Sequence, residues 1–283
     1  MSALARERIG IVGLGAIGGS LALAWRDQAS ILAWSRDPDD RDAARAAAIP
    51  VCHGEGSTWL DDIAGSTAVI IAVPLSQVAP VARELQALLP DECLVLHSSG
   101  LQRREAIGLT EPEFARLLGT HPLAGSERSG FKAADPAMFH GATVRAEARA
   151  TPMQRERIEL LWRAAGAERF VWDEAGEHDA LMSWVSHLPQ LTATALAAVL
   201  AQRSVDPNDT GPGARGTTRL AASDPQVWVP VLRRSPRETA EALRHMTSAL
   251  DALRQALESR DGATLTQLWE QARAWRAGAE DTA

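Results

Sequence analysis

Short apolar runs alternate with longer amphipathic stretches over the first 173 residues. Runs rich in Ile, Val and Leu, typical of buried strands, occupy residues 8–13, 31–34, 68–73 and 93–97, and two more strands are expected at 142–146 and 169–172. Helices are expected between them, up to about residue 28, at 39–48 and 77–89, and from Thr151-Pro152, which suit an N-cap and a first helical position. This alternation predicts a parallel sheet with right-handed crossovers.

The pattern changes after Asp173. No further run of β-branched residues follows, and apolar residues recur at helical spacing over 174–188, 191–203, 236–258 and 262–276. The chain is therefore expected to form an α/β domain over residues 1–173 and an all-helical domain over residues 174–283.

A glycine-rich loop follows the first predicted strand. Gly13, Gly15 and Gly18 form a Gly-x-Gly-x-x-Gly pattern that opens the first helix. The first glycine permits a tight turn, the second lets the backbone approach a pyrophosphate, and the third allows close packing of helix on strand. The pattern predicts a Rossmann-type dinucleotide-binding domain, the alternative being a structural turn without a ligand. The other expected cofactor contacts are Ala16, Ile17, Val73 and Pro74.

The end of the second strand bears on the choice of cofactor. An acidic residue at this place binds the ribose hydroxyls of NAD, whereas this chain has Ser35 and Arg36. A guanidinium matches a 2′-phosphate in geometry and charge, so this pair favours NADP over NAD. In the alternative, Arg36 stacks on the adenine and Asp37 contacts the ribose of NAD.

Composition excludes several other classes of protein. The 283 residues carry 29 basic and 36 acidic side chains, and a formal charge of −7 does not suit binding to nucleic acid. Cys52 and Cys93 form no disulfide or metal-binding pattern, so we expect no metal and a cytoplasmic location. The apolar run over 9–25 imitates a signal peptide, but the glycine loop explains it better. The run over 191–201 is too short for a membrane span, which takes about 20 residues.

Candidate catalytic chemistry is concentrated in residues 119–130, which read Gly-Thr-His-Pro-Leu-Ala-Gly-Ser-Glu-Arg-Ser-Gly. His121, Ser126 and Glu127 lie there on what we expect to be a glycine-rich loop after the sheet strands. A histidine in this setting suits proton transfer beside a nicotinamide, although isolated loop histidines are as often structural. Because Lys132 is the only lysine, no lysine base is expected elsewhere, and the absence of tyrosine excludes a tyrosine general acid.

Residues 121–130 resemble a motif of the prephenate and arogenate dehydrogenase family of tyrosine biosynthesis. The resemblance covers most of the chain and includes the glycine loop, residues 177–189, residues 218–225 and Trp228, in the family's order. It implies a Rossmann domain followed by an all-helical dimerisation domain, hence a homodimer, which the apolar helical half also favours. It further implies hydride transfer to NAD(P) with loss of CO2, which converts prephenate to 4-hydroxyphenylpyruvate or arogenate to tyrosine.

The resemblance also implies roles for individual residues. His121 matches the histidine that takes the proton of the substrate hydroxyl, and Ser126 and Glu127 match positions that line the substrate pocket. Arg219 matches an arginine that holds a substrate carboxylate, and Asp179 matches an acid that orients this arginine.

One face of the helix expected from residue 174 supports this assignment. Asp179, Ser183, Ser186 and Gln190 follow one another at helical spacing, with His187 beside them, and the other side is apolar. This polar face is expected to line a cleft between the domains, the alternative being a solvated face. The expected substrate-binding residues are Ser126, Glu127, Asp179, His187, Gln190, Arg219 and Trp228.

The chain departs from the family pattern in three places. Where the family commonly has Asp-x-x-Ser-x-Lys, residues 97–102 read His-Ser-Ser-Gly-Leu-Gln. Ser99, with Ser98 as the alternative, is expected to bond to the catalytic His121. Gln190 stands where many members that use prephenate have a second histidine, which leaves arogenate open as the substrate. His97 is an additional imidazole for which a structural role is favoured over catalysis.

Two other functions stay open on the sequence. One is a different NAD(P)-dependent reductase with Rossmann and helical domains that acts on a small carboxylic acid, because residues 97–100 resemble a motif in some such proteins. The other is a protein that senses a dinucleotide without turnover. The segment around His121 and the presence of Arg219 argue against a sensor, which has no need of a proton acceptor.

Overall fold

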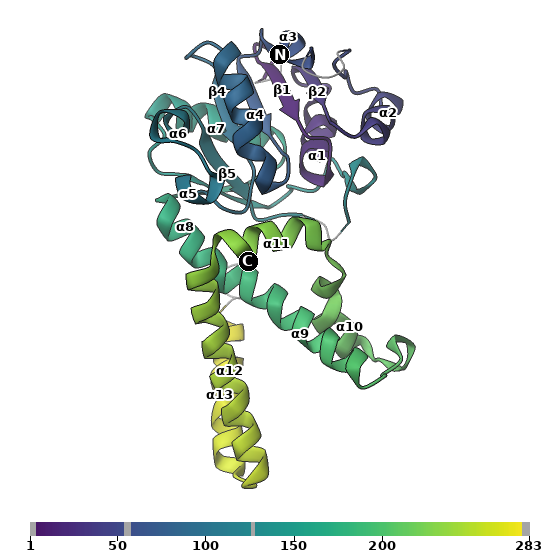
Figure 1. Cartoon of the computed structure of the whole chain (residues 1–283), viewed down its shortest axis with the longest axis vertical. Coiled ribbons are helices and arrows are strands. Elements are labelled where there is room, and N and C mark those ends of the chain that lie inside the picture. Colours follow the sequence, from purple (N-terminus) through teal and green to yellow (C-terminus); the bar gives the residue numbers. More distant parts are fainter. Residues whose placement is uncertain (1–3, 54–57, 126–127, 279–283) are drawn as a thin grey trace. The chain divides into compact units, whose positions relative to one another are not determined.

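The chain divides into two compact units, Met1–Ser235 and Pro236–Ala283, in the computed structural model drawn in Figure 1. The structure describes residues 4–53, 58–125 and 128–278. The first unit holds the whole sheet and the helices up to α11 (Pro225–Arg234). The change from mixed to purely helical structure falls at Asp173, inside this unit.

A seven-stranded sheet with the order β2-β1-β3-β4-β5-β6-β7 forms the centre of the first unit. Its strands are β1 (Arg8–Val12), β2 (Ser30–Trp34), β3 (Ala68–Ile71), β4 (Leu94–His97), β5 (Leu118–Pro122), β6 (Thr143–Glu147) and β7 (Arg169–Asp173). The strands β1 to β4 pair in parallel, as predicted, and β5, which was not predicted, pairs in parallel with β4. The prediction of a wholly parallel sheet is wrong, however, because β6 runs antiparallel to β5 and β7 pairs in parallel with β6. Of the described residues between β5 and β6, only Phe131–Ala133 form a helix, the short η1, and an antiparallel pair needs no crossover helix.

The strand β5 carries His121, which we expected on a loop. His121 pairs with Arg145 of β6 in the antiparallel register. The strand reads Leu-Gly-Thr-His-Pro, with one aliphatic residue, and it ends in a proline that cannot donate a ladder hydrogen bond. This sequence lacks the β-branched apolar run by which the other strands are identified, so its strand character comes from its neighbours in the sheet.

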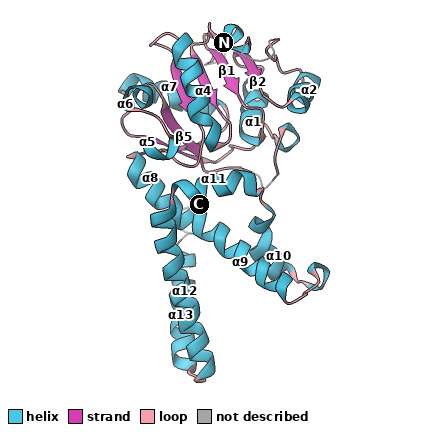
Figure 2. Cartoon of the chain, viewed as in Figure 1, coloured by secondary structure: helices cyan, strands magenta, loops and turns pink. Residues whose placement is uncertain are grey.

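Helices cover both faces of the sheet (Figure 2). They are α1 (Ala16–Trp25), α2 (Pro38–Ala46), α3 (Trp59–Ile63), α4 (Leu75–Leu88), α5 (Arg104–Ile107), α6 (Glu111–Ala115) and α7 (Pro152–Ala164). One buried cluster packs α1 and α7 on the sheet through Trp25 and Trp162, and a second packs α4 on it through Val78 and Leu85. Alternate strand residues point to opposite faces and supply the two clusters.

The first unit is helical after β7. Its elements are α8 (Ala175–Met182), the π-helical turn η2 (Ser183–His187), α9 (Leu188–Gln202), η3 (Pro207–Asp209), α10 (Pro212–Thr218), η4 (Arg219–Ala222) and α11. The two helices predicted over 174–203 are thus continuous through η2, where the N–H of Leu188 donates to the carbonyl of Ser183. Pro189 follows directly, and its ring would clash with the carbonyl four residues back in a regular helix. Helical spacing did not predict α10 and α11, which are rich in Gly and Pro or short.

The second unit consists of α12 (Pro236–Glu258) and α13 (Gly262–Ala277), as predicted. The carboxylate of Asp261 caps α13 by accepting from the N–H groups of Ala263 and Thr264. Several large apolar side chains of this unit are exposed, namely Leu243, Leu250, Leu257, Trp269 and Trp275. Among the described residues, no helix combines the length and the apolar character that crossing a membrane requires.

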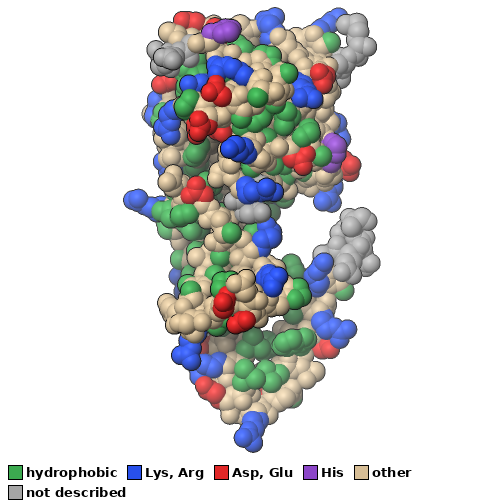
Figure 3. Space-filling model, turned by 90° about the vertical axis from the view of Figure 1, so that its right-hand side faces the viewer, with side chains coloured by type: hydrophobic (Ala, Val, Ile, Leu, Met, Phe, Trp, Pro, Cys, Tyr) green, Lys and Arg blue, Asp and Glu red, His purple; other side chains and the backbone are tan. Residues whose placement is uncertain are grey.

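Charges of both signs are interspersed on the face of the molecule drawn in Figure 3. Exposed charges also pair along single helices, as Arg254 does with Asp251 and Glu258 on α12. Such exposed pairs contribute little to stability.

Candidate active site

The glycine loop between β1 and α1 has the geometry of a dinucleotide-binding turn. Gly13 has a φ of +101°, and a Cβ there would lie 2.4 Å from the carbonyl oxygen of Ala72. A Cβ on Gly18 would lie 1.9 Å from the carbonyl oxygen of Gly13. These two glycines therefore provide the tight turn and the close helix–strand packing that the pattern predicts.

Gly15 faces open space, because a Cβ there would meet nothing within 4 Å. It is the N-cap of α1, which has no side-chain cap and no acidic residue in its first turn. The N–H groups of that turn, including those of Ala16 and Ile17, form the positive end of the helix dipole. Val73 lies beside Gly13, and Pro74 is the N-cap of α4. The loop therefore fits the pyrophosphate of a dinucleotide.

Two guanidinium groups lie at the end of β2. Arg36 is exposed, and Arg41 donates to the carbonyl oxygens of Ser35 and Arg36 at 2.6 and 3.1 Å. The buried hydroxyl of Ser35 accepts from the N–H of Asp37 at 3.2 Å. The carboxylate of Asp37 caps α2 by accepting from the N–H of Asp39 at 2.9 Å. The acidic group nearest to Arg36 in sequence is thus engaged in a helix cap.

His121 lies at a cavity formed where β5 ends. The cavity has a volume of about 350 Å³ and is lined by His121, Pro122, Leu123, Ala124, Met182, Val185 and Ser186. Its walls therefore come from β5, the residues after it, α8 and η2. The lining is apolar except at His121 and Ser186, and the volume is typical of small-molecule sites.

A series of buried polar groups lies behind His121. Nδ1 of His121 is 3.1 Å from Nε2 of His178, and Nδ1 of His178 is 2.8 Å from Oδ1 of Asp179. His178 is 0% exposed and Asp179 is 2% exposed. The Asp179 carboxylate also accepts from the backbone N–H groups of Gln102 and Arg103, at 2.8 and 3.0 Å. Hydrogen bonds thus connect the carboxylate of Asp179, the imidazole of His178 and the imidazole of His121, which reaches the cavity.

Burial keeps His121 uncharged near neutral pH. It lowers the pKa of His121 to about 3, and His178, His97, His187 and Arg145 act in the same direction. Burial also lowers the pKa of His97 to about 3 and that of His187 to about 4. A neutral imidazole has one nitrogen lone pair, so His121 is able to accept a proton.

The loop after β4 places Gly100, and not Ser99, against His121. Oγ of Ser99 is 2.8 Å from Nδ1 of His97 and donates to the carbonyl oxygen of Leu101 at 2.9 Å. A Cβ on Gly100 would lie 3.7 Å from Nε2 of His121. The prediction that Ser99 bonds to His121 is therefore wrong. Residue by residue, the serine of Asp-x-x-Ser-x-Lys falls on Gly100, so this chain has no side chain at that position.

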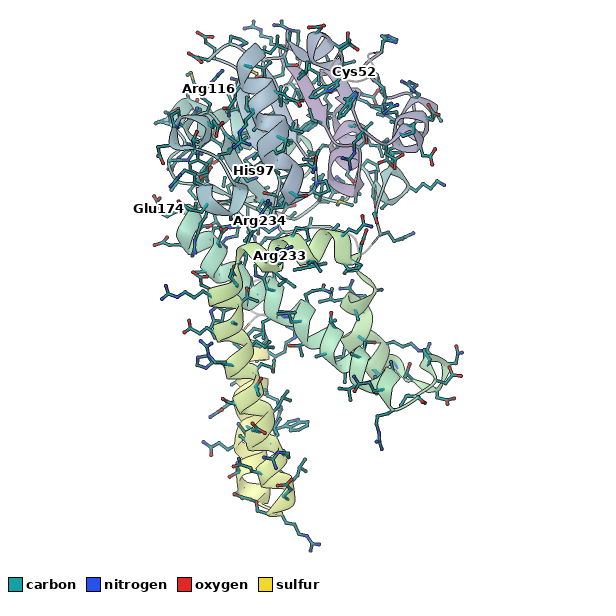
Figure 4. The ribbon with its side chains drawn as sticks, viewed as in Figure 1. Cys52, His97, Arg116, Glu174, Arg233 and Arg234 are labelled. Carbon is teal, nitrogen blue, oxygen red and sulfur yellow. The ribbon has the colours of Figure 1, made fainter. Side chains whose placement is uncertain are left out.

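His97 has a structural place at the end of β4, where Figure 4 labels it. Its side chain is fully buried, and its carbonyl oxygen accepts from Oγ1 of Thr120 at 3.1 Å. With Nδ1 bonded to Ser99, this residue links β4, the loop after it and β5. The structural role that the sequence favours for His97 agrees with these contacts.

Four of the five residues of the polar face predicted along α8, η2 and α9 are buried, and the fifth, Ser186, is half-buried and lines the cavity. Asp179, Ser183, His187 and Gln190 are all at most 5% exposed, whereas Trp184 on the other side is 43% exposed. The alternative of a solvated polar face is therefore wrong, and part of the apolar side is the exposed one. The Asp179 carboxylate is not the expected partner of Arg219, because its partners are His178, Gln102 and Arg103.

The other predicted substrate residues that the structure describes are Gln190, Arg219, His187 and Trp228. Nε2 of Gln190 donates to the carbonyl oxygen of Leu220 at 2.8 Å, so Gln190 holds the backbone next to Arg219. Arg219 is exposed at the start of η4. Trp228 of α11 meets His187 edge to face, with 6.1 Å between ring centres.

Ser126 and Glu127 lie outside the described residues. Gly125 and Arg128 on either side of them line a second cavity of about 430 Å³, together with Lys132. The lysine therefore lies in a different cavity from His121.

Two family models match the chain. Residues 21–168 match the prephenate dehydrogenase nucleotide-binding domain, and residues 174–271 match the prephenate dehydrogenase dimerization domain. The chain belongs to the prephenate dehydrogenase family. It is accordingly an NAD(P)-dependent dehydrogenase of the prephenate and arogenate dehydrogenase type.

Individual members of the prephenate dehydrogenase family resemble the chain over nearly its whole length. Prephenate dehydrogenase of Bacillus subtilis is 26% identical over 287 residues, which cover 96% of this chain and 76% of that protein. Prephenate dehydrogenase of A. aeolicus, solved with hydroxyphenyl propionate and NAD+, superposes with a TM-score of 0.86 at 22% identity, covering 98% of this chain and 99% of the other. Synechocystis arogenate dehydrogenase gives a TM-score of 0.76 at 21% identity, with 96% and 99% covered.

Sequence reasoning missed two residues of this family member's site, His178 and Gly100. His178 stands beside Asp179 in the sequence, so it does not fall at the helical spacing that defines the polar face. The sequence feature that could have identified it is a histidine next to an acid on a helix expected to carry substrate-binding residues. Gly100 carries no side chain, so only its distance to His121 reveals it.

We expect Gly15→Ala and Gly18→Ala to fail in different ways. Gly15→Ala should change the free energy of unfolding by less than about 1 kcal/mol and weaken NAD(P) binding at least about tenfold, because its methyl group enters the pyrophosphate space. Gly18→Ala, the matched control, should destabilise the fold by about 3 kcal/mol, since its methyl group meets the carbonyl of Gly13. Urea unfolding and cofactor titration by tryptophan fluorescence measure both. Unchanged cofactor affinity in Gly15→Ala would contradict the assignment.

Proposed function

We propose that the chain catalyses the oxidative decarboxylation of prephenate, arogenate or both, with His121 as the base. The observation that carries this proposal is a neutral imidazole that lines a small-molecule cavity at the end of β5, in a chain whose glycine loop fits a dinucleotide. The products are 4-hydroxyphenylpyruvate from prephenate and tyrosine from arogenate, with CO2 and the reduced cofactor.

In the proposed mechanism, His121 holds the proton of the substrate hydroxyl during the reaction. Bound NAD(P)+ supplies the hydride acceptor for the ring carbon that carries this hydroxyl. Nε2 of His121 takes the hydroxyl proton as the carbon–hydrogen bond breaks. The bond to the ring carboxylate then breaks, its electron pair makes the ring aromatic, and CO2 leaves. The proton returns from Nε2 to the phenolate oxygen, so no net proton is released.

Arg219 is the proposed clamp for a substrate carboxylate, because a guanidinium fork matches a carboxylate. Its position is supported by Gln190, which binds the carbonyl of the following residue, Leu220. His187 and Trp228 are proposed to shape the same pocket through their edge-to-face contact. Ser126 and Glu127 are proposed to complete it, since Leu123 and Ala124, shortly before them, line the cavity.

We further propose that NADP is the preferred cofactor. Arg36 follows the end of β2, and the guanidinium of Arg41 on α2 binds the carbonyls of Ser35 and Arg36 there. Asp37, the acid that could accept from the ribose in NAD mode, caps α2 instead. A guanidinium pair at this point suits a 2′-phosphate better than a ribose hydroxyl.

A homodimer formed through the helical residues 174–283 is proposed as the working unit, with the domain boundary near residue 173. Residues 174–271 match a dimerization domain. Trp184, Leu257, Trp269 and Trp275 expose 43–79% of their surface, and a second copy would cover such side chains. We also propose a cytoplasmic location, which the free, buried thiols of Cys52 and Cys93 support.

Steady-state kinetics with prephenate and arogenate, each with NAD and NADP, tests the reaction. The protein should reduce the cofactor with at least one substrate, and His121→Asn should lower kcat by about 100-fold or more with cofactor affinity retained, because the proton acceptor is lost. His53→Asn, at an exposed histidine outside the site, is the control and should keep full activity. The absence of turnover with all four combinations, or full turnover by His121→Asn, would reject the proposal.

Removal of the Arg36 guanidinium tests the cofactor preference. We expect kcat/KM to be higher with NADP than with NAD, and Arg36→Ala to lower it for NADP at least about tenfold while changing it little for NAD. Arg45→Ala, at an exposed arginine near the end of α2, should change neither value. A native preference for NAD would contradict this part of the proposal.

A further inference from the structure

We propose that His178 is a positioning residue that, held by Asp179, keeps the proton of His121 on Nδ1 and leaves Nε2 free to act as the base. The inference rests on the base role proposed for His121. It concerns a residue that neither contacts the cavity nor was suspected from the sequence.

The positions of the protons in the series of Asp179, His178 and His121 follow from the Asp179 carboxylate at its end. The Asp179 carboxylate is an acceptor only, so Nδ1 of His178, 2.8 Å from Oδ1, must carry a hydrogen. In a neutral imidazole the other nitrogen, Nε2, then has the lone pair. This lone pair is 3.1 Å from Nδ1 of His121, which must therefore donate to it. Neutral His121 has only one N–H, so its Nε2 is bare.

The opposite arrangement would leave no base. If His178 carried both protons, its Nε2 would donate to Nδ1 of His121, and the hydrogen of His121 would move to Nε2. That nitrogen faces Gly100, with 3.7 Å to the position of a Cβ, so the loop supplies no side chain that could set the tautomer instead. Among the described residues, His178, held by Asp179, is thus the group that sets the tautomer of His121.

His178 is held rigidly enough for this role. It is fully buried in the first turns of α8, and its N–H donates to the carbonyl of Glu174 at 2.9 Å. Asp179 is bonded to the N–H groups of Gln102 and Arg103, which fixes the carboxylate against the loop after β4. A group held by several bonds in a buried site keeps its orientation without reorganisation during the reaction.

The same series also stabilises the charge that forms when His121 accepts the proton. The resulting imidazolium keeps its Nδ1–H directed at the lone pair of His178, and the negative carboxylate of Asp179 lies behind that ring. Favourable electrostatics at a developing charge is stronger in a buried site than in water. His178 therefore acts on the rate of proton transfer and not on substrate binding.

Two substitutions that each keep one half of the histidine test the proposal. The amide oxygen of His178→Gln reaches about as far as Nε2 and still accepts from His121, whereas His178→Asn keeps a donor for Asp179 but no acceptor for His121. We expect kcat to fall less than about tenfold in His178→Gln and about 100-fold or more in His178→Asn, with KM and cofactor affinity nearly unchanged in both. Equal losses in the two variants, or a loss confined to KM, would overturn the proposal.

A second measurement does not depend on turnover or on the stability of a variant. Nitrogen NMR of the unmodified protein labelled at histidine, with the His121 signal assigned through His121→Asn, reports which nitrogen carries the proton. Protonated Nδ1 and bare Nε2 at neutral pH are expected, and the reverse would overturn the proposal. Because this readout needs no substrate, failure of the proposed reaction and failure of the proposed tautomer are distinguishable.

Discussion

The buried carboxylate of Asp179 connects the parts of the site. It accepts hydrogen bonds from two backbone N–H groups after β4 and from the imidazole of His178, all within 3.0 Å. A buried carboxylate is costly unless it is fully bonded, so α8, the loop and His178 hold one another in place. His121 then takes its orientation from His178. Removing the carboxylate would release the loop and the imidazole together, which is why the tests above act on His178.

The reversal of strand direction at β6 brings a second set of contacts to the same point. Because β6 is antiparallel to β5, Arg145 lies opposite His121, and its carbonyl accepts from Nε2 of Gln102 at 2.9 Å. Gly119 leaves room for this glutamine, since a Cβ there would lie 2.8 Å from it. Arg145 in turn pairs with Asp173 at the end of β7. The glycine loop follows β1 in the parallel part of the sheet, and the proposed base lies on β5, where the parallel part meets the antiparallel strand β6.

The sequence reveals the features that depend on local pattern. Apolar runs predicted the strands other than β5, and the glycine spacing predicted the turn at Gly13 and the close packing at Gly18. It could not reveal contacts between distant segments. The strand character of β5 comes from pairing with its neighbours, and the hydroxyl of Ser99 lies against His97, which ends β4 two residues earlier. The two backbone N–H groups that donate to Asp179 are 76 and 77 residues away. Spacing along α8 therefore indicated a polar face but not these partners, and the resemblance suggested a different one, Arg219.

Burial keeps His121 neutral, and the series of Asp179 and His178 leaves its Nε2 ready to accept a proton. The most direct test follows the imidazole signal of His121 by NMR as the pH is lowered from 8, with circular dichroism at each pH to verify that the protein is folded. The pKa of His121 lies well below its ordinary value because of burial, at about 3, so the ring should stay neutral down to the pH at which the protein unfolds. Protonation of His121 in the folded protein with a midpoint near the ordinary histidine pKa of about 6.5 would contradict the account.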